Sequence, residues 1–200
     1  MRKQFSALLV ASSLCLASTA SAQTVINFDN LSNNTVVTNQ YTGVSFSSTA
    51  GNTNYITAQS SYNGSKPNFL CSGPVNSSIN CTAATIVTFE SAVSGVSLKG
   101  MGINDVGNVK VAQVDLYNGL TFLGSQNILG NGEGYNPLLI DLSSWGSITR
   151  FDLTNITDGG GIGWDDITYT SRPTSVPEPS SLALVAAGLV GVAAARRRRA

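Results

Sequence analysis

Short runs of alternating apolar and polar residues fill most of the chain between residues 24 and 170. The clearest run is 109–117, where Ala112, Val114 and Leu116 share one face and Gln113 and Asp115 lie on the other. Successive side chains of a strand point to opposite faces, so this run predicts a strand whose alanine, valine and leucine face a core. The same pattern, or enrichment in β-branched and aromatic residues, predicts ten strands, near 24–29, 43–47, 54–57, 85–90, 95–99, 109–117, 122–127, 136–141, 149–154 and 166–170.

Turn residues separate these predicted strands. Asn118-Gly119 and Gly130-Asn131-Gly132 have the chemistry of tight turns. Between the two ends of the chain no long stretch shows helical periodicity with caps. Many short strands joined by such turns predict an all-β fold, a single β-sandwich of the jelly-roll type, over residues 23–172. Residues 173–175 are expected to be a short linker.

The first residues have the pattern of a secretory signal peptide. Arg2 and Lys3 precede an apolar stretch, and Ala20-Ser21-Ala22 fits a cleavage site with small residues. The alternative is a first transmembrane helix, which the short apolar run disfavours. We therefore expect residues 1–22 to be removed during export by the general secretion machinery.

The last residues combine a second apolar run with a cluster of positive charge. Residues 182–195 are all apolar or small, and Arg196, Arg197, Arg198 and Arg199 follow directly. As a helix the run is about 21 Å long, so a thin membrane span over 180–195 needs flanking serines and snorkelling arginines. The positive-inside rule keeps the arginines cytoplasmic, which predicts a stop-transfer anchor.

Residues 176–200 also contain Pro177, Glu178 and Pro179 ahead of the apolar run. This order of a Pro-Glu-Pro motif, an apolar helix and terminal arginines resembles the PEP-CTERM protein-sorting signal. The resemblance implies recognition and processing by an exosortase near the Pro-Glu-Pro. It also implies a Gram-negative bacterium with an exopolysaccharide or biofilm matrix, and an inner-membrane-anchored intermediate that ends at the cell surface or in the matrix. The alternative is a plain C-terminal anchor.

Charge and composition narrow the functions of the exported part. It carries five basic residues against all 11 acidic ones, a net charge of −6, and this argues against nucleic-acid binding. The chain has no histidine, which excludes a Ser-His-Asp triad, a Cys-His pair and histidine-based zinc or copper sites. No motif selects two acids for a glycosidase, so we expect a protein that is not an enzyme.

Two cysteines, Cys71 and Cys81, remain after signal removal. An even pair in an oxidising compartment predicts a disulfide. The spacing is not C-x-x-C, so a redox role is the weaker alternative.

The two ends of the domain carry short motifs that resemble those of known families. Residues 26–29 and 41–46 resemble the opening of many PEP-CTERM exported domains, and residues 163–169 resemble the closing strand of galactose-binding-like jelly rolls. In such jelly rolls the first and last strands pair, and carboxylates there often hold a structural calcium. The resemblance therefore suggests a structural calcium site involving Asp29 with Asp165 or Asp166, whose side chains point to opposite faces if both are extended. The alternative is that these side chains cap turns.

Exposed aromatic side chains are the available surfaces for stacking on sugar rings. Trp145 and Trp164 are weak candidates, because a tryptophan in a β-sandwich is more often part of the core. The first functional hypothesis is a structural or adhesive component of the extracellular matrix, associated with exopolysaccharide. The alternatives are a carbohydrate-binding module and, least favoured, a secreted hydrolase.

Overall fold

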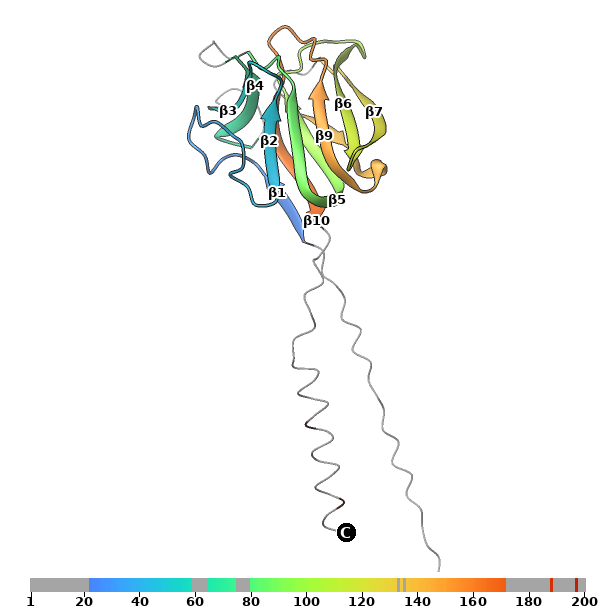
Figure 1. Ribbon diagram of the computed structural model, residues 1–200. Helices are drawn as coiled ribbons and strands as arrows, with labels where there is room; N and C mark the ends of the chain where they lie inside the picture. Colours follow the sequence, from blue (N-terminus) through green and yellow to red (C-terminus); the bar gives the residue numbers. More distant parts are fainter. Residues whose placement is uncertain are drawn as a thin grey trace, which may run out of the picture.

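The computed structural model of the chain describes residues 22–58, 65–74, 80–132, 134, 136–171, 188 and 197. These residues form ten antiparallel strands and one short 3-10 helix, η1 (Ser143–Trp145). The strands belong to one curled, all-β sheet with two packed layers. Figure 1 shows one layer across the front of the domain, in the order β2 (Val44–Ser48), β5 (Thr85–Met101), β9 (Ile148–Thr154), β6 (Lys110–Asn118) and β7 (Thr121–Leu129).

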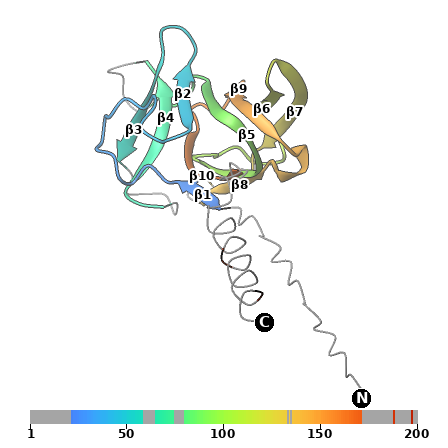
Figure 2. The ribbon, with the colours of Figure 1, turned by 60° about the horizontal axis from the view of Figure 1, so that its bottom comes forward.

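The second layer is built around the last strand, β10 (Gly163–Ser171). One edge of β10 pairs with β5, and the other pairs first with β4 and then with β1. The remaining strands of this layer are β1 (Gln23–Ile26), β3 (Thr53–Ala58), β4 (Asn68–Gly73) and β8 (Leu138–Asp141). The pairing of Gln23 with Thr170 brings the start of β1 and the end of β10 to the same pole (Figures 1 and 2).

Strand β5 joins the two layers because it is 17 residues long. Its first half pairs with β2 and β9, and its second half with β8 and β10. Between the halves the pairing register with β9 shifts, and Gly95 has a φ of 60°, which a glycine adopts without strain. The sequence predicted two separate strands here, which is wrong, because the irregular segment bends the strand without ending it.

The core lies between the layers and follows the predicted alternation. Ala112, Val114 and Leu116 of β6 are fully buried, as predicted, whereas Gln113 and Asp115 on the opposite face are half-buried. Phe151 and Leu153 of β9 contribute to the same core. Burial of these side chains supplies the main free energy that holds the layers together.

Strand β4 was not predicted. All six of its residues are buried, since the strand has β3 on one side and β10 on the other and is covered on both faces. Such a strand has no apolar–polar alternation to detect. It carries Cys71, which forms the predicted disulfide with Cys81.

The disulfide connects β4 to Cys81, in the short segment that leads into β5. Cys81 pairs with Gly161, and the Ile162 amide donates to the Cys81 carbonyl oxygen at 3.1 Å. A methyl group on Gly161 would lie 2.3 Å from the Cys81 carbonyl carbon, so this approach requires glycine. The Ala83 amide donates to the Ser72 carbonyl oxygen at 3.0 Å, so the disulfide joins two segments that a backbone hydrogen bond already holds together.

Several predicted features lie outside the described residues. They are the signal peptide apart from Ala22, the linker, the Pro177-Glu178-Pro179 motif, the helix 180–195 apart from Gly188, and the arginine cluster apart from Arg197. In the part of the chain that the structure describes, no helix has the length and apolar character needed to cross a membrane.

Candidate functional site

The front layer presents a polar and aromatic outer face, opposite the core. The pairing register aligns Thr88, Arg150 and Tyr117 across β5, β9 and β6, and it places Asp152 beside Asp115 in the next row. We call this face the outer platform. Its members on the four strands β5, β9, β6 and β7 are Thr88, Gln113, Asp115, Tyr117, Phe122, Ser125, Arg150, Asp152 and Thr154.

Two aromatic rings and one arginine form a continuous cluster on the outer platform. The guanidinium carbon of Arg150 lies 4.0 Å from the centre of the Tyr117 ring, and the Tyr117 and Phe122 rings are 5.4 Å apart. Phe122 is 53% exposed, so its ring is open to solvent. Arg150 donates two hydrogen bonds to Asp152, of 2.8 and 2.7 Å, and these raise the pKa of the arginine. The guanidinium is therefore held over the tyrosine ring as a permanent cation.

A hydrogen-bond network lies beside this cluster and is centred on Asp115. Its carboxylate accepts hydrogen bonds from Gln113, Ser125 and Thr154. Lys110 donates to the Gln113 side-chain oxygen and extends the network along β6. Flat rings next to fixed donors and acceptors are suited to a ligand with both an apolar face and hydroxyl groups, such as a sugar ring.

The two predicted tryptophans are not on the outer platform. Trp164 has no exposed surface and belongs to the core, which removes it as a sugar-binding candidate. Trp145 is half-buried, and its ring covers the core side of β7, where a methyl group on Gly124 would lie 2.7 Å away. Its indole N–H donates to the Gln126 side chain at 3.1 Å.

The sequence reasoning missed Tyr117 and Phe122. Both lie in the hairpin that the Asn118-Gly119 turn predicts. The observed loop is Gly119-Leu120, so Asn118 pairs with Thr121 and Tyr117 lies opposite Phe122. That signal was present in the sequence. The contribution of Arg150 was not, because it depends on the pairing of β9 with β6.

A second group of polar residues surrounds Asp165. This residue follows Trp164 in β10 and is fully buried. Ser65 donates to one of its carboxylate oxygens at 2.7 Å, and the Asp166 amide donates to the other at 2.8 Å. Burial nevertheless raises the pKa of Asp165 to about 7. Burial, followed by the charges of Asp29 and Asp165, raises the pKa of Tyr41 to about 12, so these groups act on one another electrostatically.

The three aspartates predicted for calcium divide between two environments. The side chain of Asp166 accepts a hydrogen bond from Lys99 at 2.8 Å. Asp29 accepts one from the Asn68 amide at 3.0 Å, and its charge contributes to raising the pKa of Asp165. No cluster of three or more acidic or other metal-binding side chains occurs among the described residues. Calcium takes six to eight oxygen ligands, so a site at Asp29 and Asp165 would need most of them from neutral groups. The calcium site stays a prediction.

The end of the chain matches a known sorting signal. Residues 175–199 match the PEP-CTERM protein-sorting motif. The chain therefore carries this motif at its C-terminal end, as the sequence predicted, and the motif implies export and sorting by an exosortase.

The β-domain has structural similarity to several solved proteins. The stig cyclase FisC from Fischerella sp. TAU is 12% identical, with a TM-score of 0.45, over 76% of this chain and 99% of that one. A family 29 carbohydrate-binding module complexed with mannohexaose is 11% identical, with a TM-score of 0.35, over 76% and 92%. The low-affinity xylan-binding module CBM86 from Roseburia intestinalis is 12% identical, with a TM-score of 0.31, over 74% and 93%. No curated protein sequence matches this chain.

Proposed function

We propose that this protein is an exported component of the cell surface or extracellular matrix of a Gram-negative bacterium, delivered by an exosortase. The N-terminal signal starts translocation, and the arginines stop it at the inner membrane. The exosortase then processes the anchored intermediate near Pro177-Glu178-Pro179 and releases it to the surface or matrix. The observation that carries the proposal is the match of residues 175–199 to the sorting motif.

Two features of the domain fit this destination. The disulfide between Cys71 and Cys81 suits an oxidising compartment outside the cytoplasm. The described surface is dominated by hydroxyl and amide side chains, and its few charges are acidic in balance. We propose a structural or adhesive role in the matrix and no enzymatic activity.

The outer platform favours a second candidate function, the binding of carbohydrate. The exposed ring of Phe122, the ring of Tyr117 and the network around Asp115 lie on one sheet face. They provide stacking surface and hydroxyl partners together. Exopolysaccharide of the producing cell is the ligand that the proposed location makes available.

The sorting claim is tested with two tail variants that should fail in different ways. Changing Pro177-Glu178-Pro179 to alanines should leave the protein anchored in the inner membrane and unprocessed. Changing Arg196 to Arg199 to serines should release uncleaved protein, because each arginine costs about 2.5–3.5 kcal/mol at mid-membrane and its removal lets the weakly apolar helix slip through. Fractionation and mass spectrometry of the tail distinguish these products.

The linker provides a matched control for both tail variants. Changing Thr174 and Ser175 to alanine should leave processing unchanged. Trimming and delivery of both tail variants at the parental rate would refute the sorting role.

Carbohydrate binding is tested on immobilised exopolysaccharide from the producing cells. Replacing Tyr117 and Phe122 together with alanine should weaken retention about tenfold or more, as expected for the loss of two stacking surfaces. Leu139→Ala is the control, because Leu139 is 63% exposed on β8, in the other layer. Equal retention of all three proteins would exclude the outer platform as a carbohydrate site.

A further inference from the structure

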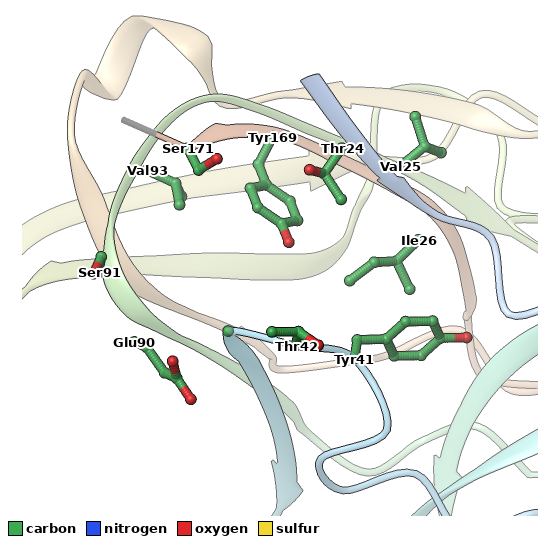
Figure 3. Close-up of a pocket in the computed structure, with 11 residues that line it drawn as sticks. Thr24, Val25, Ile26, Tyr41, Thr42, Glu90, Ser91, Val93, Tyr169 and Ser171 are labelled. Carbon is green, nitrogen blue, oxygen red and sulfur yellow. The ribbon is translucent and has the colours of Figure 1, made fainter. Parts of the chain in front are cut away.

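A cavity of about 560 Å³ lies away from the outer platform, at the pole of the domain where β1 starts and β10 ends. Figure 3 shows side chains from β1, β5 and β10 and from the Tyr41–Gly43 segment around it. Its size falls within the range of about 300–1,000 Å³ that small-molecule sites occupy. None of its lining residues belongs to the outer platform, so the two features are separate.

The hydroxyl group of Tyr169 is the first sign that the cavity takes a polar ligand. Tyr169 is only 6% exposed, and its hydroxyl points into the cavity (Figure 3). Within the described part of the chain this hydroxyl has no hydrogen-bond partner. The ring is held in place by Phe89, 4.9 Å away, and by the pairing of Tyr169 with Thr24. The hydroxyl faces the cavity, where a ligand with hydrogen-bonding groups can reach it.

The charges around the cavity define the class of ligand. Glu90 is the one charged residue in the lining, and its carboxylate has no ion-pair or hydrogen-bond partner among the described residues. The lining contains no lysine or arginine, which disfavours phosphate, sulfate and uronic acids. The hydroxyls of Thr24, Thr42 and Ser91 add neutral donors and acceptors.

Part of the cavity lining is apolar. Ile26 and Val93 line the cavity together with the ring of Tyr41, whose hydroxyl points away and donates to Asn30 at 2.8 Å. The cavity thus combines an apolar wall, neutral hydroxyls and one carboxylate acceptor. Uncharged sugars have the matching combination of C–H faces and hydroxyl donors.

We propose that this cavity is a binding site for one or two units of an uncharged saccharide, with Tyr169 and Glu90 fixing the sugar hydroxyls. The site acts independently of the outer platform and takes a chain end or a short oligosaccharide, whereas the open sheet face accommodates the side of a longer chain. Its lining residue Ser171 is the last residue of β10, so the site remains in the protein when the tail is processed near Pro177.

Saturation-transfer NMR on the full-length protein in detergent tests this site. The probes are D-glucose, D-galactose, N-acetyl-D-glucosamine and cellobiose, with D-glucuronic acid and spermidine as charged comparisons. At least one neutral probe should bind with a Kd in the millimolar range or tighter. Tyr169→Phe, which removes only the hydroxyl, and Glu90→Gln, which removes only the charge, should each weaken that binding about tenfold.

The controls keep the result separate from the outer platform and from folding. Leu139→Ala, which lies on β8 outside both candidate sites, should leave binding of the small probes unchanged. Loss of binding in Tyr117→Ala, with binding retained in Tyr169→Phe and Glu90→Gln, would assign the probes to the outer platform and overturn the proposal. Glu90 is exposed, so Glu90→Gln remains informative even if Tyr169→Phe perturbs the core. Absence of binding by every neutral probe, tighter binding of a charged probe, or binding by both variants that equals that of the parent protein would also overturn it. Processing of the tail is measured separately, so failure here leaves the sorting proposal intact.

Discussion

Arg150 links the aromatic and acidic parts of the outer platform, because its guanidinium stacks on Tyr117 at 4.0 Å and forms two hydrogen bonds with Asp152. The side chain of Asp152 is only 10% exposed, so its carboxylate depends on this one cation. Residues 150 and 152 lie on the same face of β9, and the register with β6 brings Tyr117 beside Arg150. The arginine thereby holds a nearly buried charge and an aromatic ring in fixed positions.

Arg150→Ala should lower the free energy of unfolding by about 1–2 kcal/mol, because it leaves the Asp152 carboxylate unpaired and uncovers Tyr117. The value is modest because Arg150 is itself partly exposed. Arg150→Lys keeps the charge but loses the flat, two-pronged contact, and it should recover only part of the loss. Urea denaturation measures both variants. Full recovery by lysine would show that the stacking and paired geometry contribute nothing.

The second prediction concerns the disulfide between Cys71 and Cys81. Replacing Cys71 and Cys81 together with serine should lower the free energy of unfolding by about 2–3 kcal/mol, the value for closing a short loop in the unfolded chain. In the exported protein neither cysteine should react with an alkylating reagent until a reductant is added. Two free thiols in the unreduced mature protein would refute the bridge.

The sequence predicted the fold class and most strands because their alternation survives in the folded state. Residues 109–117 became β6, with Ala112, Val114 and Leu116 inside as predicted. Val111, which the alternation places on the outward face, is also buried, because the register with β7 shifts between Lys110 and Ala112. Strand β4 was missed because a strand buried on both faces has no periodic signal, and β5 was divided because its bend interrupts the pattern near Gly95.

The candidate sites were harder to predict, because they are assembled by pairing between strands far apart in the sequence. Tyr117 meets Arg150 only through the register of β6 with β9, and Tyr169 meets Thr24 only through that of β10 with β1. Trp164 illustrates the opposite case. Its residue type made it only a weak candidate for a sugar platform, because a tryptophan in a β-sandwich is more often part of the core, and its place in β10 puts it there.

The raised pKa of Asp165 leads to a prediction of how the free energy of unfolding depends on pH. Its pKa is about 7 in the folded protein, against a model-compound value of 3.8, so the folded state holds this proton over a pH range where the unfolded chain has lost it. The unfolded state therefore binds fewer protons between about pH 4 and pH 7, and this residue's contribution to stability falls as the pH rises through that window and is constant above it. The full difference corresponds to about 4 kcal/mol at most.

Asp165→Asn should remove this contribution and flatten the pH profile of the free energy of unfolding between pH 4 and pH 8, measured with EDTA present. Asp29 and Asp166 also act on Asp165, so Asp166→Asn serves as the comparison and should keep most of the slope. An unchanged slope in Asp165→Asn would mean that the carboxyl ionises in the folded protein as readily as in the unfolded chain.

Calcium provides the last prediction. We expect Ca²⁺ to raise the melting temperature through Asp29 and Asp165, which influence one another electrostatically, and not through Asp166, which is paired with Lys99. A cation would offset the cost of burying the Asp165 charge and recruit neutral oxygens to complete its shell. Millimolar Ca²⁺ should therefore raise the melting temperature of the parent protein and of Asp166→Asn by similar amounts. Asp29→Asn and Asp165→Asn should lose that increase. Mg²⁺, which demands a smaller and stricter octahedral shell, should stabilise the parent less. Identical melting curves in excess EDTA and in Ca²⁺ would show that the two carboxylates bind no calcium and serve only as hydrogen-bond acceptors for Asn68, Ser65 and the Asp166 amide.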